Sequence, residues 1–281
     1  MAACPAMGEI VTDFEVGPRD GLQNEARRIP AELVDRLSCC GFRKIEVSSF
    51  ISPKCVPQMA DAAQVLEEIR RRPGTTYAAL TPNLRGFERA LAARADEGAI
   101  FASASEAFSQ KSINCSVAES IERFRPLLAA ASEQGPPVRG YVSAITDCPY
   151  SGPVIRDQGA AVAGELLRLG CCEVSLGSAA AEGTDSLLRV LRDRIPASVL
   201  FGHFQDSKGK ALENIALCLT RGLRTFDASI AGLGGCPSAP GAVGNLATEA
   251  VCRLLAGSVY ETGIDPNELR STAAFARGLT A

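Results

Sequence analysis

Short apolar runs rich in β-branched residues recur along the whole chain, and longer segments of a different period separate them. The runs are too short for helices, and their composition is typical of buried strands. Strands are therefore predicted over residues 10–16, 44–48, 76–80, 99–102, 138–144, 172–176, 198–204 and 225–230.

The segments between these runs carry apolar residues three and four positions apart, which is the spacing of a helix with one buried face. Helices are predicted over residues 31–38, 58–71, 84–93, 117–133, 154–169, 185–193 and 208–220. A strand followed by a helix, repeated in this way, indicates parallel βαβ units.

Repeated βαβ units in this number predict an α/β protein of the closed (β/α)8 type, the TIM barrel. An open doubly wound sheet often carries a glycine fingerprint after its first strand, whereas the first strand here is followed by GPRDG at 17–21. A barrel occupies roughly 250 residues, so we expect residues 1–281 to form a single domain. C-terminal helices are expected from about residue 257, one of them over 265–278.

Charge and composition exclude several classes of partner. The formal net charge is -3 and no dense run of Lys and Arg occurs, so no nucleic-acid partner is expected. No stretch of about 18 apolar residues is present, and residues 1–10 lack the features of a signal or transit peptide. We therefore expect no membrane partner and a cytoplasmic location. The 11 cysteines form no regular framework and are expected to be mostly reduced and buried.

Active sites of barrels lie at the ends of the strands, so polar residues at these positions are the candidates for chemistry. They are Arg19 and Asp20 after the first strand, Glu46 and Ser48 on the second, Ser178 after the sixth, His203 and Gln205 on the seventh, and the loop 232–245 after the eighth.

His203 is the only histidine of the chain, which excludes a two-histidine metalloprotease motif. Because His203 and Gln205 are two positions apart on a strand, their side chains point to one face, and Asp20 can project toward the same point. A carboxylate, an imidazole and an amide oxygen suit a divalent cation such as Mg²⁺ or Mn²⁺. Taken alone, these residues leave a purely structural role for His203 equally open.

The loop that begins GLGGCP at 232–237 lacks the Lys-Ser/Thr pair of a P-loop. We interpret it as a lid that carries Cys236, with an ordinary barrel loop and an incidental thiol as the alternative. Arg19 and Asp20 have a similar alternative, a surface ion pair beside a turn formed by Gly17 and Pro18.

Longer motifs in nearly the whole chain resemble those of the 3-hydroxy-3-methylglutaryl-CoA lyase family, a group of barrel metallolyases. The resemblance rests on EVGPRDGLQNE at 15–25, SF at 49–50, SPK at 52–54, VPQM at 56–59, LTPNL at 80–84, INCS at 113–116, VRGYVS at 138–143, AGLGGCP at 231–237 and GNLATE at 244–249.

The resemblance implies carbon-carbon cleavage of a 3-hydroxyacyl-CoA to acetyl-CoA and a keto acid, with Mg²⁺ or Mn²⁺ as cofactor and a homodimer as the assembly. Its metal ligands fall on Asp20, His203, Gln205 and Asn245. Its catalytic residues fall on Arg19, Glu46, His203 and Cys236, and the substrate-binding positions expected here are Gln23, Ser48, Asn114 and Ser178.

The chain departs from the family pattern near the expected site. The family has His-X-His where this chain has His203-Phe204-Gln205, and an acidic residue where Ser178 stands. These changes leave open a family member that acts on, or forms, a different acyl-CoA. They also leave open a non-catalytic homologue that binds CoA esters.

Overall fold

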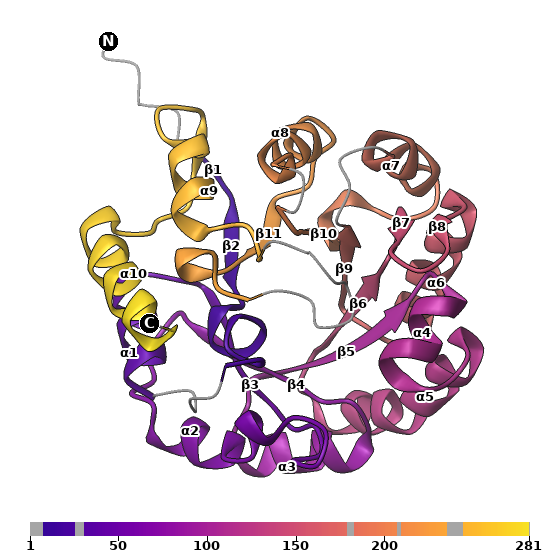
Figure 1. Cartoon of the computed structure of the whole chain (residues 1–281), viewed down its shortest axis with the longest axis horizontal. Coiled ribbons are helices and arrows are strands. Elements are labelled where there is room, and N and C mark those ends of the chain that lie inside the picture. The colour runs from indigo at the N-terminus through magenta and orange to yellow at the C-terminus, as the bar shows by residue number, and fades with distance from the viewer. Residues whose placement is uncertain (1–7, 26–30, 179–182, 207–208, 235–243, 281) are drawn as a thin grey trace.

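The predicted strands close into one parallel barrel. The computed structural model describes residues 8–25, 31–178, 183–206, 209–234 and 244–280. The barrel strands are β2 (Thr12–Glu15), β3 (Lys44–Ser49), β4 (Thr76–Leu80), β5 (Glu97–Ser103), β6 (Val138–Ser143), β9 (Glu173–Ser178), β10 (Leu200–Phe204) and β11 (Thr225–Ala228). Around the barrel they follow the order β10-β11-β2-β3-β4-β5-β6-β9, which confirms the predicted fold class (Figure 1).

The α-helices form a ring outside the barrel (Figure 1). Because parallel strands need a crossover connection, each barrel strand is linked to the next through this ring. The helices are α1 (Ala31–Cys40), α2 (Ala62–Glu68), α3 (Leu84–Ala92), α4 (Glu106–Ile113), α5 (Val117–Gln134), α6 (Arg156–Arg168), α7 (Thr184–Arg192), α8 (Ala211–Thr220), α9 (Thr248–Leu255) and α10 (Pro266–Thr280).

Several helix boundaries follow from local hydrogen bonds. Ser116 and Glu119 form a reciprocal capping box at the start of α5, and the side chains of Asn83 and Ser105 cap α3 and α4. Such caps satisfy backbone N–H groups that have no partner within the helix. They place the starts of α3 and α5 where the sequence predicted them.

The remaining short elements were not predicted as such. The expected strand 10–16 is divided into β1 (Glu9–Ile10), which pairs with β12 (Tyr260–Glu261), and β2. A small antiparallel hairpin of β7 (Asp147–Cys148) and β8 (Gly152–Pro153) follows β6. Short helical turns are η1 (Gly17–Gly21), η2 (Pro57–Met59), η3 (Ala197–Val199) and η4 (Ile230–Gly232).

Helix prediction was wrong at three places. The expected helix 58–71 is shorter, because Ile69 is extended at the end of α2 (ψ 144°) and the N–H of Arg70 donates to Asp35 instead of continuing the helix. The helices α4 and α9 were missed. In α4, only Phe108 and Ser109 are buried. A helix with so small a buried face needs no apolar stripe, so the periodicity of the sequence did not reveal α4.

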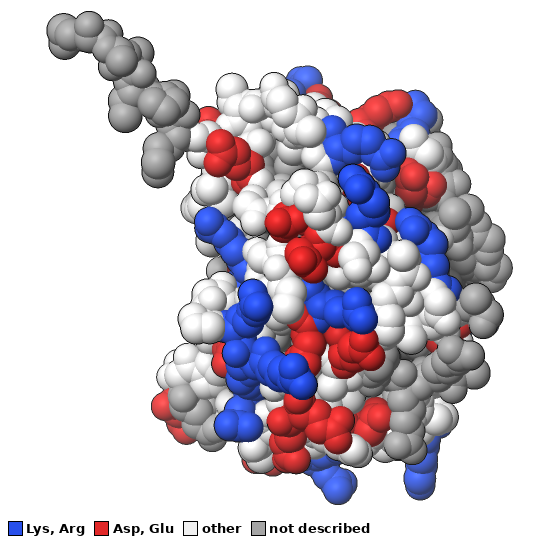
Figure 2. All heavy atoms as spheres, turned by 90° about the vertical axis from the view of Figure 1, so that its left-hand side faces the viewer, with Lys and Arg blue, Asp and Glu red and all other residues white. Residues whose placement is uncertain are grey.

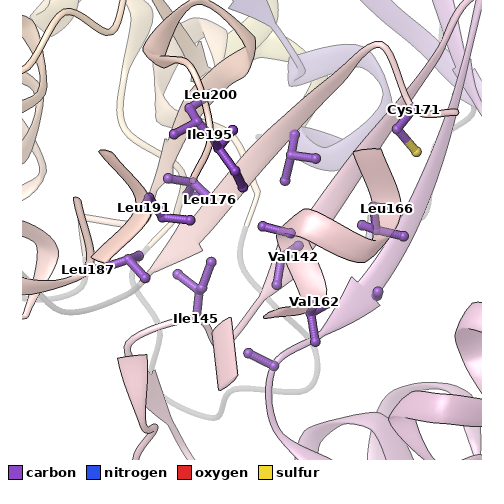
Figure 3. Close-up of a cluster of buried hydrophobic side chains, with 14 of the residues drawn as sticks. Val142, Ile145, Val162, Leu166, Cys171, Leu176, Leu187, Leu191, Ile195 and Leu200 are labelled. Atoms are coloured by element: carbon purple, nitrogen blue, oxygen red, sulfur yellow. The ribbon is translucent and has the colours of Figure 1, made fainter. Parts of the chain in front are cut away.

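The core lies between the barrel and its helices. Figure 3 shows one part of it, where side chains of β6, β9 and β10 meet those of α6 and α7. Labelled there are Val142, Ile145, Val162, Leu166, Cys171, Leu176, Leu187, Leu191, Ile195 and Leu200, all of them buried. Each large aliphatic side chain buried in this way contributes about 1.5 to 3 kcal/mol. The site above this core therefore rests on a closely packed scaffold.

The barrel interior contains charged groups as well as apolar ones. Arg139 on β6 is fully buried, and its guanidinium lies 4.1 Å from the ring centre of Phe14 and 4.7 Å from that of Tyr141. Its Nη2 atom is 3.0 Å from Oδ1 of Asp227 on β11. A buried charge requires such a partner, so Arg139 holds a carboxylate in place beneath the strand ends.

Charges of both signs are mixed on the face that Figure 2 shows, which is the side of α1 and α10. Arg36 pairs with Glu32 within α1, and Arg277 of α10 pairs with Glu249 of α9. No described helix is both long enough and apolar enough to cross a membrane.

Candidate active site

The turn after β2 presents two charged side chains to the barrel axis. Residues 17–21 form one π-helical turn, and Pro18 lies in its first two positions. At the start of a helical turn a backbone N–H has no partner within the turn, so its absence in proline costs no hydrogen bond. The turn places Arg19, which is only 7% exposed, directly over the strand ends. Arg19 Nε lies 2.5 Å from Glu46 Oε2 of β3, and Nη1 lies 2.5 Å from Asp20 Oδ1.

Glu46 is the inner partner of this arginine. Its Oε2 atom also accepts a hydrogen bond of 3.2 Å from the hydroxyl of Tyr141. Burial raises the pKa of Glu46, and the positive charges of Arg19 and Arg139 oppose part of that rise. Two carboxylates and one tyrosine thus fix the orientation of the Arg19 guanidinium.

Asp20 connects the first strand with the last loop of the barrel. Its Oδ2 accepts a hydrogen bond of 2.7 Å from Asn245 Nδ2, and its Oδ1 accepts one of 3.1 Å from Gln23 Nε2. Burial alone would raise the pKa of Asp20, but the charges of Arg19 and His203 outweigh it and lower the value. Asp20 therefore carries a negative charge over the whole neutral pH range.

Glycine is required where the last loop approaches this carboxylate. Gly234 has φ of +99°, and a Cβ there would lie 2.8 Å from the backbone oxygen of Asp20 and 2.9 Å from Asn245 Nδ2. Gly234 of the 232–237 motif thus has a packing role, because it allows the turn after η4 to lie against η1.

His203 on β10 is oriented by a carboxylate that the sequence analysis missed. Its Nδ1 atom donates to Oδ2 of Asp227 across the β10–β11 pair at 3.2 Å, and Ser175 Oγ donates to the same oxygen at 2.7 Å. With Nδ1 engaged, Nε2 is the nitrogen left for other partners. A charged residue within the short strand TFDA at 225–228 was the sequence signal for Asp227.

The electrostatics of the pair agree with this orientation. Burial alone would raise the pKa of Asp227, but Arg139 and the hydrogen bond from His203 lower it to about 2. Burial alone would lower the pKa of His203, but its bond to Asp227 and the charges of Asp227 and Asp20 raise it. Asp227 is thus a permanent anion that fixes the imidazole tautomer, as carboxylates do beside metal-binding histidines.

A cavity with two connected lobes lies above these residues. Its lobes measure about 130 and 230 Å³. Both lobes are lined by Asp20, Gln23, Phe108, Ser143, Gly177 and His203. The smaller lobe continues past Ala144, Asp147, Pro149, Ser178 and Gln205. The larger lobe continues past Arg19, Ile51, Leu80, Phe101, Ser112, Tyr141 and Val142.

The structure brings together most of the predicted site residues. Arg19, Asp20, Gln23, Ser178, His203 and Gln205 line the cavity, Glu46 supports Arg19, and Asn245 is bonded to Asp20. The backbones of Gln205 and Asn245 also form a β-bridge.

Two predicted substrate-binding residues lie elsewhere. The Ser48 hydroxyl is fully buried and donates to Met59 Sδ at 3.5 Å, and Ser48 is not among the residues that line either lobe. A register shift between Glu46 and Ser48 in β3 accounts for this, since it changes the alternation of faces along the strand. Asn114 is an exposed, left-handed residue (φ 48°) at the end of α4 and lines neither lobe. Cys236 lies outside the described residues.

The donor atoms at this site fit a divalent cation. Asp20 carries a carboxylate, His203 a ring nitrogen, and Gln205 and Asn245 each carry an amide oxygen. Asn245 Nδ2 donates to Asp20 Oδ2 and to the Leu233 carbonyl, so its Oδ1 is the atom that could bind a cation. Within the described ranges, no three His, Cys, Asp or Glu side chains gather into a metal-binding group. A cation at this site would therefore need the two amides as ligands in addition to Asp20 and His203.

The fold and the site together define a class of protein. Charged side chains from η1, β3, β10 and the last loop converge at the carboxyl ends of the strands of a closed parallel barrel, which is where barrel enzymes carry out their chemistry.

Comparison with known proteins is consistent with that class. The HMGL-like family model matches residues 11–276. A 3-hydroxy-3-isohexenylglutaryl-CoA/hydroxy-methylglutaryl-CoA lyase of Pseudomonas aeruginosa is 52% identical over 91% of this chain and 88% of the relative. The chain belongs to the HMGL-like family.

Solved structures agree over the same extent. The HMG-CoA lyase of Brucella melitensis superposes with a TM-score of 0.93 at 48% identity, over 97% of this chain and 99% of that one. An HMG-CoA lyase from Acenitobacter baumannii, solved with coenzyme A and 3-methylmalate, has a TM-score of 0.92 at 30% identity, over 99% and 93% of the two chains.

Proposed function

We propose that the protein is a carbon-carbon lyase that cleaves 3-hydroxy-3-methylglutaryl-CoA, or a close 3-hydroxyacyl-CoA, to acetyl-CoA and a keto acid. The observation that carries the proposal is the convergence of Arg19, Asp20 and His203 on one cavity, with Asn245 bonded to Asp20. Membership of the HMGL-like family and the names of its relatives support it.

The proposed cofactor is Mg²⁺ or Mn²⁺, held by Asp20, His203, Gln205 and Asn245. A bound cation of this kind would polarise the tertiary alcohol of the substrate and make its proton easier to remove. Asp20 supplies the negative charge of the ligand set, and Asp227 keeps His203 in one tautomer with Nε2 available.

The remaining residues act on the substrate itself. Transfer of the alcohol proton to water in the cavity would allow the bond between C2 and C3 to break. The electron pair of that bond then forms the enolate of the thioester, while the alkoxide becomes a ketone. Arg19, fixed by Glu46, can stabilise the negative charge that develops on the enolate oxygen. Cys236 would then deliver a proton to the enolate carbon, giving acetyl-CoA, because both ring nitrogens of a cation-bound His203 are engaged.

The experiment is incubation of the purified protein with 3-hydroxy-3-methylglutaryl-CoA and Mn²⁺ or Mg²⁺, with acetyl-CoA measured over time. The matched control is Arg19→Gln, which should retain the fold and lose at least about a hundredfold in rate, the size expected when one charge-stabilising donor is removed. A wild-type rate no higher than that of the variant would overturn the proposal and favour a non-catalytic CoA-ester-binding protein.

A second candidate substrate has a longer alkyl branch at C3. The larger lobe is lined by five apolar side chains, namely Ile51, Leu80, Phe101, Phe108 and Val142. Such a surface favours an alkyl chain over water. One relative is named for the isohexenyl substrate as well as the methyl one. The ratio of kcat/KM for the two esters decides between them, and a ratio that favours the methyl ester more than tenfold would rule out the longer branch.

We also propose a cytoplasmic homodimer. Relatives are named as both cytoplasmic and mitochondrial enzymes. Light scattering on the purified protein and fractionation of the source cells test these two points separately.

A further inference from the structure

Asp147 is a carboxylate in the cavity wall, and it is neither one of the proposed ligands nor one of the proposed catalytic residues. It begins the β7–β8 hairpin that follows β6, and it lines the smaller lobe together with Ser178 and Gln205. Asp147 and Asp20 are the only carboxylates among the described residues that line the cavity.

The hairpin holds Asp147 firmly although its own carboxylate is not bonded. The neighbouring residues Thr146 and Cys148 are 1% and 2% exposed. The Thr146 carbonyl accepts bonds from Val154 N at 3.1 Å and from Arg156 Nη1 at 2.6 Å, and Cys148 Sγ accepts one from Ser105 Oγ at 3.0 Å. The part-buried carboxylate of Asp147 makes no hydrogen bond or ion pair within the described part of the chain. It is therefore not needed to build the turn.

The charges around the site show why a second carboxylate would strengthen the binding of a divalent cation. Arg19 lies between Glu46 and Asp20, and Arg139 pairs with Asp227, so these five groups together carry two positive and three negative charges. Asp20 then leaves a single negative charge among the proposed ligands, since His203, Gln205 and Asn245 are neutral donors. A divalent cation would be only half neutralised by Asp20. Asp147 brings the second negative charge to the side of the cavity where the amide of Gln205 lies.

We propose that Asp147 is a second anionic group for the cation at this site and acts across a water molecule, because among the described residues Asp147 does not gather with Asp20 and His203 into a set of three direct ligands. It acts from the same wall as Ser178, whose hydroxyl is hydrogen-bonded to that of Thr146, the residue before Asp147. The inference rests on the proposed function in one respect only, namely that the cavity binds a divalent cation.

The test measures Mn²⁺ binding to the metal-stripped protein by calorimetry, without any CoA ester. Asp147→Asn keeps the shape of the side chain and removes its charge, so the affinity should fall about five- to twentyfold. Asp157→Asn on α6 is the control, because Asp157 is an exposed carboxylate paired with Arg194 away from the cavity. That control should leave the affinity within about twofold, since solvent screens exposed charges.

A second variant protects the test against a local folding defect. Ser178→Asp in the Asp147→Asn background returns one carboxylate to the same wall, and it should recover most of the lost affinity. Loss of affinity on Asp147→Asn with recovery in the double variant supports the inference. Equal affinity of wild type and Asp147→Asn, an equal loss in Asp157→Asn, or no recovery in the double variant overturns it.

Failure of the lyase proposal would look different. A protein that binds Mn²⁺ through Asp147 but releases no acetyl-CoA from any of the esters would refute the proposed reaction and leave the role of Asp147 standing. Cleavage of the ester together with an unchanged Mn²⁺ affinity in Asp147→Asn would refute the role of Asp147 and leave the proposed reaction standing.

Discussion

Asp13 on β2 is a buried carboxylate outside the candidate site, and we expect it to destabilise the protein at neutral pH. It is 2% exposed, and neither of its oxygens has a hydrogen-bond partner among the described residues. Burial raises its pKa well above the ordinary value, and the negative charges of Glu15, Asp227 and Glu249 raise it further. No positive charge is among these causes.

The predicted change is that Asp13→Val stabilises the protein. Leaving a buried polar group unsatisfied costs about 1 to 3 kcal/mol, and valine suits a strand. Because a domain of this size gains roughly 2 °C in Tm for each kcal/mol, the variant should melt about 2 to 6 °C higher at pH 8.

The effect should depend on pH, and its sign is fixed by the raised pKa. In the folded state Asp13 holds its proton to a higher pH than in the unfolded state, so its contribution to stability is present at low pH and lost as the pH rises through the folded-state pKa. The advantage of Asp13→Val should therefore grow between pH 5 and pH 8. Glu15, whose pKa is raised to about 7 mainly by burial, changes stability in the same direction in both proteins, and its repulsion with Asp13 is part of the difference between them.

The assay is thermal unfolding of wild type and Asp13→Val at several pH values, with Asp193→Asn as the control for loss of an exposed carboxylate. Asp193 lies at the end of α7 with an exposed side chain and should change Tm by less than about 1 °C. A lower Tm for Asp13→Val at pH 8, or a difference that shrinks as the pH rises, would refute the reasoning.

Three further predictions concern the site. Asp20→Ala should abolish Mn²⁺ binding, because Asp20 is the only anionic member of the proposed ligand set. Gln205→His should strengthen Mn²⁺ binding about tenfold, because imidazole is a better ligand than an amide for this metal. Calorimetry that shows an unchanged Mn²⁺ affinity in one of these variants would mean that the replaced side chain does not face the cation. Asp227→Asn should lower the pKa of His203, since Asp227 raises it, and because His203 is the single histidine one resolved imidazole signal in an NMR titration reports this directly; an unchanged value would show that the pair does not form. Cys236→Ser should keep the wild-type Tm and lose about a hundredfold or more in turnover, as for a proton donor, and normal turnover with a lower Tm would assign the thiol a structural role instead.

The pattern of apolar residues determined the barrel, because strands and helices differ in period and length and the crossover of parallel strands leaves few topologies. It also located Arg19, Asp20, His203 and Gln205, since polar residues at strand ends stand out against apolar runs. The glycines at 232–237 were recognised as unusual, but only the structure shows that Gly234 packs against Asp20 and Asn245.

Tertiary structure decided which polar residues share the cavity. Ser48 follows Glu46 by two positions and was expected to join it, yet a register shift in β3 turns its hydroxyl toward Met59. Asp227 and Asp147 belong to the site or its wall although no motif marked them. The physical reason is that sequence periodicity gives the face of a residue within its own strand, whereas hydrogen bonds and charge pairing depend on neighbours tens of residues away, which only the closed barrel brings together.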